Sequence, residues 1–563
     1  MNFQSIKLAF FNFSYIFVFL TGFVACDNQS SVSKPTESKL FPKTSIQLET
    51  IASTLSNSLN SPQMSIDCML DTSRNDSLIR TKIKEFYTNN NFKPVWINEQ
   101  GINSNTELYL AALDSLKFDG LQPEQYSIFK QHPEYEKFKT QKEHSNEDWS
   151  KFELCMTKSF FMASHDLVIG KLYDQNKKNK NWKNVNDSTF DEVLALKKSI
   201  LANDFNAAFA FMRPKHPWYT SFRAEYIRLD SLKKSGDVSQ ITQLKDSIPL
   251  GFSSPEIALL RKRLFTELKL DMDSNSSVCD AKLIETIKTF QFRNQLKTTG
   301  RLDTATLRKL NLNYDLKQQK LALNMERMRW LRHDFAQPYI WSNIPKMEVD
   351  YVENDSVMFN MRTVVGRPSR ATMTLDTKIK DIVFSPPWIV PPTILKEDVL
   401  PGLARRGGSY LARKGLRAYD RRGRQVSGSG INSSNFRNFS FGQAPGYNSS
   451  LGEIKFNMPN PWSIYMHDTP HREDFVKFYR ANSSGCVRVH KPKEFAAFLL
   501  RDSAKYSYQK VDSICKLRKT IFVPMTRNIN VHFVYLTTAL DSTGNIMYLK
   551  DIYDWDNKVI GMK

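Results

Sequence analysis

After its first 25 residues the sequence lacks any apolar stretch long enough to span a lipid bilayer, which excludes an integral membrane domain in the body of the chain. It also lacks a cluster of metal ligands. His467 and His471 lie four residues apart, but Thr469 and Pro470 between them argue against a helical pair of ligands. The sequence therefore predicts neither a metal nor any other cofactor.

Cysteine is scarce, with six residues in a chain of 563. Two of them, Cys26 and Cys486, stand in short motifs of their own, and the four others are Cys68, Cys155, Cys279 and Cys515. Four cysteines allow three pairings, and spacings this wide give no disulfide fingerprint. Buried reduced thiols are at least as compatible with the sequence, so no disulfide is assigned.

The composition is that of a globular protein with several domains. Apolar residues make up 41% and aromatic residues 12%, and 563 residues exceed the size at which a single hydrophobic core stops growing. Three or four folding units are therefore expected. The net charge of +21 favours polyanionic surroundings, which include nucleic acid, an acidic membrane surface and an anionic cell wall.

The N-terminus predicts a lipoprotein signal. Lys7 precedes an apolar run from Leu8 to Ala25, and the small Ala25 stands before Cys26, which would carry the lipid after cleavage. An uncleaved membrane anchor is the alternative. Both place the rest of the chain outside the cytoplasm. The predicted location is the cell envelope, facing the periplasm, with a lipid anchor in the inner or outer membrane.

The hydrophobic pattern changes along the chain. From about Ile66 to Leu250 apolar residues recur at helical spacing, whereas from Met347 onward they alternate as in strands. The predicted fold class is α+β multidomain, with a helical scaffold before a β-rich domain. The predicted divisions are a signal peptide (1–25), a flexible tether (26–62), a helical scaffold domain (63–254), a three-helix module (255–313), a connecting scaffold helix (314–335), a β-rich domain (336–511) and C-terminal strands with a closing segment (512–563).

The module before the connecting helix has a compact helical pattern. Leu283, Ile287 and Phe290 share one helix face, and a turn at Gly300 precedes a second helix from about Thr304. The pattern resembles the small peptidoglycan-binding domain through Phe290, Gln291, Gly300, Asp303, Thr306, Leu307, Leu310 and Asn311. That resemblance implies docking to glycan or stem peptide, whereas the residues alone predict only a three-helix module.

A long, glycine-rich and basic segment lies inside the β-rich domain, at about residues 389–440. Its cations include Arg405, Arg406, Arg413, Lys414, Arg417, Arg421, Arg422 and Arg424. Such a loop in a compact domain is typically a lid or binding loop, so a capping loop is predicted. Because no aromatic stacking pattern accompanies the arginines, nucleic acid is not expected as a partner. Their guanidinium groups suit peptide carboxylates instead.

The candidate chemistry rests on Cys486, within Ser-Ser-Gly-Cys-Val-Arg, and on His467, 19 residues earlier at the end of a predicted strand. Only roughly a few per cent of a free thiol is ionised at neutral pH, and a histidine supplies the base that a nucleophilic cysteine needs. Taken singly, each residue is more often an inert thiol or an ordinary histidine. Together they favour a nucleophile with its base.

Residues beside the cysteine complete the predicted site. Gly485, Ser483 and Ser484 are expected to support the nucleophile or an oxyanion. Arg488 points to the same side as Cys486 in an extended segment, where it either holds a substrate carboxylate or braces the loop.

The strand, the histidine, the fixed gap and the Ser-Gly-Cys-hydrophobic-Arg string resemble the signature of the L,D-transpeptidases with a YkuD-type catalytic domain. Further segments resemble the large periplasmic YcbB-like branch of that family, namely Leu323–Leu331, Val364–Arg370, Pro386–Ile394, Gly442–Asn460, Met466–Pro470 and Asn545–Asp556. The chain departs from residues frequent in the family at Ser484, His490, Gly442 and Met373. These positions flank the nucleophile and base, so they bear on substrate fit.

By this resemblance the Cys486 thiolate attacks the third, diamino-acid residue of a tetrapeptide donor stem and releases its terminal D-alanine. The side-chain amine of a second stem then converts the thioester into a 3-3 cross-link of peptidoglycan. His467, oriented by a backbone carbonyl or by Asp468, would move the protons. The other candidate substrate-binding residues are Trp388, Gln443 and Lys455.

Two alternatives remain open at this stage. Water in place of the amine would make the protein an L,D-carboxypeptidase. A non-catalytic peptidoglycan-binding lipoprotein would keep the fold as an anchor, although the intact pair of Cys486 and His467 argues against it. The sequence gives no oligomeric state.

Overall fold

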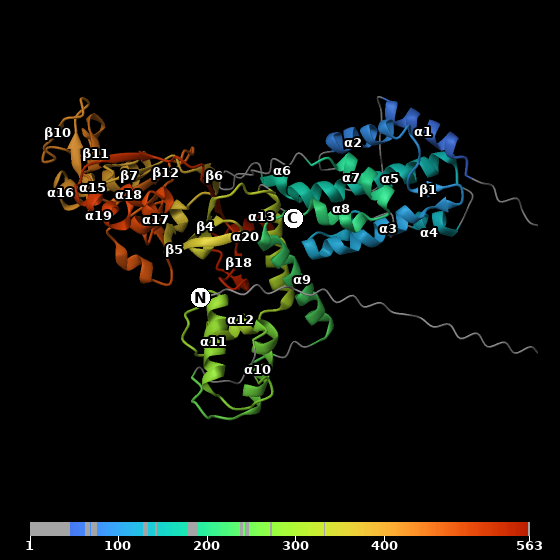
Figure 1. Ribbon diagram of the computed structural model, residues 1–563, viewed down its shortest axis with the longest axis horizontal. Coiled ribbons are helices and arrows are strands. Elements are labelled where there is room, and N and C mark those ends of the chain that lie inside the picture. The colour runs from blue at the N-terminus through green and yellow to red at the C-terminus, as the bar shows by residue number, and fades with distance from the viewer. Residues whose placement is uncertain are drawn as a thin grey trace, which may run out of the picture. The chain divides into compact units, whose positions relative to one another are not determined.

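The structure is a computed structural model that describes residues 46–61, 68, 76–127, 133–140, 144–176, 190–236, 240–241, 247–270, 273–331 and 333–560. The predicted signal peptide, Cys26 and most of the predicted tether lie outside these residues. Among the helices described, none is both long and apolar enough to cross a membrane. Helices come first along the chain and strands follow, as the α+β prediction requires (Figure 1).

The scaffold is helical, as predicted, and packs around α5. Its helices are α1 (Leu48–Asn60), α2 (Asp76–Asn89), α3 (Ser104–Leu113), α4 (Pro133–Thr140), α5 (Asn146–His165), α6 (Tyr173–Asn176), α7 (Glu192–Ala202), α8 (Phe205–Met212) and α9 (Pro217–Lys234). A short hairpin of β1 (Ile97–Asn98) and β2 (Gly101–Ile102) interrupts them. The scaffold begins earlier than predicted, because α1 lies within the segment expected to be a flexible tether and buries Ile51, Leu55 and Leu59 in the scaffold core. Trp96 and Tyr109 are fully buried in the hydrophobic core of the scaffold.

A disulfide joins Cys68 to Cys155 of α5, across 87 residues of sequence. No pairing was predicted, because residues so far apart in sequence reveal their proximity only in the folded chain. Cys279 and Cys515 are buried free thiols. The disulfide closes a long loop, so it stabilises the scaffold mainly by restricting the unfolded chain.

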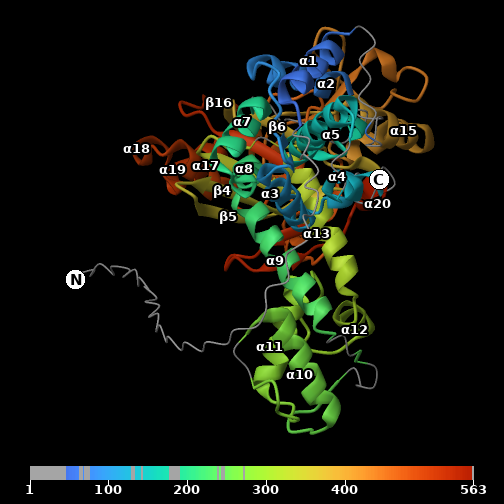
Figure 2. The ribbon, with the colours of Figure 1, turned by 90° about the vertical axis from the view of Figure 1, so that its right-hand side faces the viewer.

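The predicted three-helix module contains α10 (Pro255–Leu268), α11 (Ala281–Arg293) and α12 (Thr304–Leu310), which lie together in both ribbon views (Figures 1 and 2). Leu283, Ile287 and Phe290 are buried on α11, as their spacing predicted. Gly300 adopts φ +72°, and a Cβ there would lie 2.8 Å from Ile284, so the turn requires glycine.

The connecting helix, α13 (Tyr314–Arg329), begins at the predicted residue and ends six residues before the predicted boundary at 335. It contacts three other parts of the chain through buried polar groups. These contacts are Lys317–Glu267, Asn324–Thr537 and Arg329–Asp119. Because buried polar groups must be paired, they fix α13 against the module, the C-terminal strands and the scaffold.

The C-terminal part is built on one curled sheet of eleven strands, in the order β16-β7-β12-β13-β15-β5-β4-β3-β17-β6 with β14 beside β5. Its strands are β3 (Tyr339–Asn343), β4 (Glu348–Glu353), β5 (Ser356–Gly366), β6 (Leu375–Lys378), β7 (Asp381–Phe384), β12 (Ile454–Asn457), β13 (Met466–His467), β14 (Ala481–Ser483), β15 (Val487–Val489), β16 (Ile521–Pro524) and β17 (Asn530–Val534). The accompanying helices are α17 (Pro492–Leu500), α18 (Ser503–Tyr506), α19 (Tyr508–Lys516) and α20 (Trp555–Ile560).

The segment from Val531 to Leu540 contributes to two strands in different sheets. β17 ends at Val534, and β18 (Thr538–Leu540) pairs with β19 (Ile546–Tyr548) in a separate hairpin. The chain leaves the large sheet at Tyr535, whose hydroxyl binds the Asp551 carboxylate and accepts a hydrogen bond from the Tyr553 amide.

The predicted capping loop is a small folded unit, called the cap here and taken as residues 388–443. It contains β8 (Trp388–Ile389), β9 (Arg417–Tyr419), β10 (Gln425–Val426) and β11 (Ser440–Gln443), with α14 (Pro392–Ile394), α15 (Leu400–Arg406) and α16 (Ser409–Arg413). Val399, Leu403, Leu411 and Phe441 form part of a hydrophobic core that belongs to the cap itself. The cap therefore holds its shape through its own packing.

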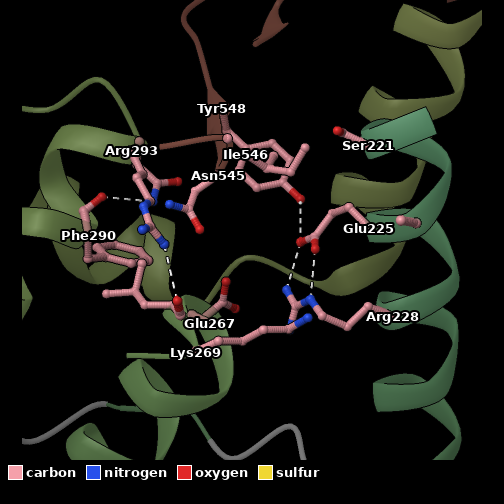
Figure 3. A pocket seen from close by; sticks show the side chains of 14 residues that line it. Ser221, Glu225, Arg228, Glu267, Lys269, Phe290, Arg293, Asn545, Ile546 and Tyr548 are labelled. Carbon is pink, nitrogen blue, oxygen red and sulfur yellow. Dashed lines mark hydrogen bonds and ion pairs between the residues drawn. The ribbon is translucent and has the colours of Figure 1, made fainter. Parts of the chain in front are cut away.

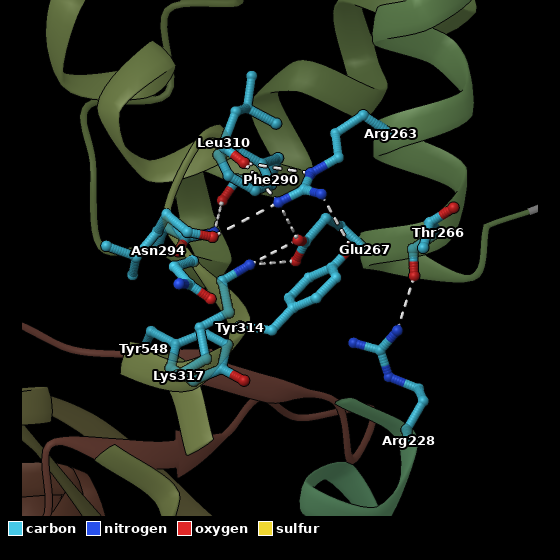
Figure 4. Close-up of polar contacts among 12 residues, drawn as sticks. Arg228, Arg263, Thr266, Glu267, Phe290, Asn294, Leu310, Tyr314, Lys317 and Tyr548 are labelled. Atoms are coloured by element: carbon cyan, nitrogen blue, oxygen red, sulfur yellow. Dashed lines mark hydrogen bonds and ion pairs between the residues drawn. The ribbon is translucent and has the colours of Figure 1, made fainter. Parts of the chain in front are cut away.

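Glu267 is the centre of a buried ionic cluster between α10 and α13. Both of its carboxylate oxygens lie 2.6 Å from the Lys317 ammonium, and Arg263 lies 3.4 Å away (Figure 4). Glu267→Gln would leave two buried cations without a carboxylate, so we expect it to cost about 3 kcal/mol of stability. Calorimetric unfolding of the full chain measures this.

Glu285→Gln is the matched control, since Glu285 is largely exposed on α11 and pairs with Lys288 at the surface. It should cost less than about 1 kcal/mol. Equal losses for the two variants would contradict the role assigned to the buried cluster.

Candidate active site

Three neighbouring strands line up the polar side chains of the site. Lys455 of β12 lies opposite His467 of β13, and His467 lies opposite Arg488 of the parallel strand β15. Residues opposite one another point to the same face, so these three side chains share one face of the sheet. Met466 and Val487, the next pair in the register, point into the core and are fully buried.

Cys486 directly precedes β15 and lies on the wall of the same cavity as His467. The cavity has a volume of about 740 Å³, within the range of small-molecule sites. Lys455, Arg488 and Trp388 also line it, and Trp388 comes from the cap. The structure thus brings together the predicted nucleophile, the predicted base and three of the four candidate substrate-binding residues.

Tyr465 contacts the sulfur and was not predicted. The Cys486 thiol donates to the Ser463 carbonyl at 3.8 Å, and the Tyr465 amide and phenol lie close enough to lower the pKa of that thiol by hydrogen bonding. The Lys455 ammonium lies 4.1 Å from the centre of the Tyr465 ring. Strand alternation could have identified this residue, since Tyr465 stands two positions before His467 and shares its face.

The nucleophile and base both rest uncharged. Burial raises the pKa of the Cys486 thiol, although Tyr465, Lys455 and Arg488 act in the opposite direction. Burial, followed by the positive charge of Arg488, lowers the pKa of His467 to about 3. These shifts favour a protonated thiol beside a neutral imidazole, which is the protonation state of a general base before reaction.

A backbone carbonyl orients His467. Its Nδ1 lies 2.5 Å from the Asp468 carbonyl oxygen, so Nδ1–H donates there in the tautomer that leaves Nε2 as the base. The Asp468 carboxylate is occupied elsewhere, because it accepts from the Glu453 amide at 2.9 Å and pairs with Arg472 at 2.9 Å. Of the two orienting groups considered from sequence, the structure selects the carbonyl.

The Ser-Ser-Gly turn before the cysteine is held by its own hydrogen bonds. The Ser483 hydroxyl donates to the Cys486 carbonyl at 2.6 Å and accepts from the Gly485 amide at 3.2 Å. The Thr372 hydroxyl donates to the Gly485 carbonyl at 2.7 Å, and Gly485 has φ +117°, which favours glycine. Since Ser483 already engages the Gly485 amide, these two residues shape the turn, and the Gly485 amide is not available as an oxyanion donor.

Arg488 braces the site while lining the cavity. Its guanidinium pairs with the Asp474 carboxylate at 3.0 Å, and Asp474 also binds Lys477 and Asn482. Of the two roles left open for Arg488, bracing is therefore present in the structure. Asp474 was not predicted, because its contact with Arg488 depends on the path of the loop between β13 and β14.

Arg370 connects the cap to Ser484, a residue of the Ser-Ser-Gly turn before Cys486. Its buried guanidinium pairs with Asp398 at 2.7 Å and Glu397 at 2.6 Å, both in the cap, and donates to the Ser484 hydroxyl at 3.1 Å. Ser484 thus lies at the joint between cap and nucleophile. Fixing this joint holds the wall of the cavity that includes Trp388.

Gln443 and the cap arginines, which were predicted to contact substrate, lie outside the cavity. Gln443 is outside the set of cavity-lining residues, and its amide binds the Lys414 carbonyl and the Ser450 amide within and beside the cap. The cap arginines from Arg405 to Arg424 do not line the cavity either. They are exposed on the outside of the cap, so their predicted contact with stem-peptide carboxylates inside the site is not available in this structure.

A second, smaller cavity of about 240 Å³ lies beside α9, the module and β19 (Figure 3). Most of its charged groups pair with other side chains or with the backbone. Glu225 forms two contacts with Arg228 at 2.6 and 2.7 Å, and Arg293 donates to the Leu268 carbonyl at 3.1 Å. These pairs indicate that the smaller cavity is a contact region between α9, the module and β19. The candidate nucleophile and base line the larger cavity instead.

Comparisons with known proteins agree with this organisation. Residues 81–225 match the "Scaffold domain" family model, residues 253–310 match the "Putative peptidoglycan binding domain" model, and residues 337–512 match the "L,D-transpeptidase catalytic domain" model, YkuD. The order of the three is the order predicted from the sequence.

A Haemophilus influenzae protein with the curated name "Putative L,D-transpeptidase" is 35% identical over 244 residues, which cover 43% of this chain and 49% of that protein. The match thus spans about half the length of this relative. Two solved structures titled L,D-transpeptidase align with 52% of the chain. The one from Xylanimonas cellulosilytica is covered completely, at 12% identity and TM-score 0.18, and the one from Stackebrandtia nassauensis to 97%, at 11% identity and TM-score 0.20.

The hydrogen bond from Tyr465 predicts a pH effect. Tyr465→Phe keeps the ring beside Lys455 but removes the phenol donor that lowers the pKa of the Cys486 thiol. We expect the thiol pKa to rise, because the phenol no longer stabilises the thiolate by hydrogen bonding. The rate of alkylation of Cys486 by iodoacetamide is measured at several pH values by intact-protein mass spectrometry. The midpoint of the curve of rate against pH should lie at higher pH in Tyr465→Phe than in the parent protein.

Tyr447→Phe removes an exposed phenol and should leave this midpoint in place. An unchanged midpoint in Tyr465→Phe would show that the phenol does not act on the sulfur.

Proposed function

Because the chain carries an L,D-transpeptidase catalytic domain at residues 337–512, we propose that it cross-links peptidoglycan stem peptides through a thioester on Cys486. The observation that carries the proposal is the placement of Cys486 and His467 on one wall of a cavity of about 740 Å³. The peptidoglycan-binding domain at residues 253–310 supports the same polymer as substrate.

The first half of the proposed reaction forms the thioester. His467 accepts the thiol proton as the Cys486 sulfur attacks the carbonyl carbon of the third, diamino-acid residue of a tetrapeptide stem. The adduct collapses when the carbon–nitrogen bond to the terminal D-alanine breaks. His467 returns its proton to the leaving amine, so free D-alanine and an acyl-enzyme result.

The second half transfers the acyl group to an amine. The side-chain amine of a second stem attacks the thioester carbon and gives up a proton to His467. The carbon–sulfur bond then breaks, the sulfur recovers its proton, and a 3-3 cross-link between two diamino acids remains. If water replaces the amine, the same thioester is hydrolysed and the activity is that of an L,D-carboxypeptidase.

The electrostatic surroundings support this sequence of steps. A neutral imidazole can accept the thiol proton, and His467 stays neutral above about pH 4 because burial lowers its pKa to about 3. Once the sulfur becomes negative, Lys455 and Arg488 stabilise it, since both act to lower the pKa of Cys486. The positive charges therefore favour the reacting state over the resting thiol.

We further propose that the protein faces the periplasm and is anchored by lipid on Cys26. The apolar run from Leu8 to Ala25 with cysteine directly after it supports a lipoprotein signal. The disulfide between Cys68 and Cys155 supports an oxidising compartment outside the cytoplasm.

The proposed reaction predicts a covalent intermediate. Purified protein incubated with disaccharide-tetrapeptide should gain the mass of the donor lacking D-alanine, with the adduct on Cys486, and should produce 3-3 dimers. Intact-protein mass spectrometry detects the adduct, and chromatography with tandem mass spectrometry identifies the cross-link.

Cys486→Ala should form neither adduct nor dimer, whereas Cys279→Ala, which removes a buried thiol in the module, should retain both. Hydrolysed monomers without dimers would replace the transpeptidase with the carboxypeptidase. A folded wild-type protein that forms no adduct would contradict the thioester mechanism.

A further inference from the structure

The outside of the cap is densely and almost uniformly positive. Between residues 400 and 440 its cations are Arg405, Arg406, Arg413, Lys414, Arg417, Arg421, Arg422, Arg424 and Arg437, and all nine are exposed. Asp420 is the single acid in that stretch, and its carboxylate pairs with Arg424 at 2.9 Å. Nine cations against one acid give this stretch eight of the 21 net positive charges of the whole chain.

Neither the fold nor the active site accounts for these charges. The cap is held together by its apolar core, which includes Leu403, Leu411 and Phe441. The cap residues that line the catalytic cavity are Trp388 to Ile394 with Glu397 and Asp398, and none of the nine cations is among them. Like charges gathered on one small unit repel one another, so the cluster is stabilised when an external polyanion binds.

We propose that the outer surface of the cap binds the carboxylate-bearing wall polymer beside the stem that is being cross-linked. The identity of this polymer rests on the proposed function. Stem peptides carry free carboxylates, and guanidinium groups pair with carboxylates through two parallel hydrogen bonds. Eight of the nine cations are arginines, which suits this geometry better than lysines would.

The character of the surface favours a hydrated polymer over a membrane. Between residues 400 and 440, all of which are described, no large hydrophobic side chain is exposed, and the nearest ones in sequence are Ile389 and Tyr447. Surfaces that bind bilayers combine cations with apolar side chains that enter the lipid. Single-stranded nucleic acid sites likewise present aromatic rings for stacking. A polymer of sugar and short peptides requires neither feature.

Binding by the cap would favour polymeric substrate. A strand held on the outside of the cap keeps its neighbouring stems within reach of the cavity that the inside of the cap borders. Once the cap holds a strand, entry of a neighbouring stem into the cavity is an intramolecular step, which takes place at a raised effective concentration. The cap thereby adds to the module a second, purely ionic contact with the wall.

The test measures binding of the full chain to purified sacculi in a pelleting assay, with Cys486→Ala in every protein so that turnover plays no part. Replacing Arg405, Arg406, Arg421 and Arg422 by Gln should weaken binding about tenfold at moderate ionic strength. Added salt should weaken binding of the parent and reduce the difference between the two proteins.

Two further variants separate local from general effects. The same four residues changed to Lys should keep binding within about threefold, because the charge remains. Replacing Lys84, Lys151, Lys197 and Lys198, four exposed lysines of the scaffold, by Gln removes an equal charge and should leave binding unchanged.

The proposal is overturned if the cap and scaffold Gln variants lose binding equally, or if the cap variant binds sacculi as tightly as the parent. It is also overturned if the cap substitutions abolish binding to vesicles of phosphatidylglycerol and cardiolipin while sacculus binding persists. None of these results depends on acyl-enzyme formation, so failure of the proposed reaction and failure of cap binding remain distinguishable.

Discussion

The parallel pairing of β13 with β15 fixes the relation on which the site depends. The register that places His467 opposite Arg488 also places Cys486 beside Tyr465 and on the same face as the imidazole. A shift of one residue would turn every side chain of the strand to the opposite face and bury the polar groups against the core. Met466 and Val487 prevent that shift, since both are fully buried on the apolar face.

Burial then determines the protonation of the site. A desolvated thiol and a desolvated imidazole are each more stable uncharged, so the pair does not form a resting ion pair. The same low-polarity surroundings strengthen the interaction of Lys455 and Arg488 with any negative charge that develops. In the proposed reaction, the same surroundings would therefore keep the thiol protonated at rest and stabilise the thiolate during attack.

Much of the fold was predictable because it depends on local spacing. The helix face formed by Leu283, Ile287 and Phe290 and the alternation around Val349 are periodic patterns that a short segment contains completely. The pairing of Cys68 with Cys155 is different, since it requires two distant segments to meet. The break after Val534 likewise arises from tertiary contacts of Tyr535 that its own segment does not reveal.

The candidate site likewise combines residues that local sequence predicts with contacts that only the folded chain reveals. Cys486 and His467 were predictable from residue type, spacing and resemblance, and the structure places them on one cavity wall. The contact of Arg488 with Asp474 was not, because it depends on how a loop folds back. The basic segment was predicted to contribute to the site, but its own core directs the arginines outward.

The separate core of the cap has an evolutionary consequence. A unit that keeps its own shape, and that is tied to the nucleophile turn through Arg370, can gain, lose or recharge its outer residues while the register of the sheet stays the same. Its exposed outer residues can therefore vary while the cap residues that line the cavity stay the same.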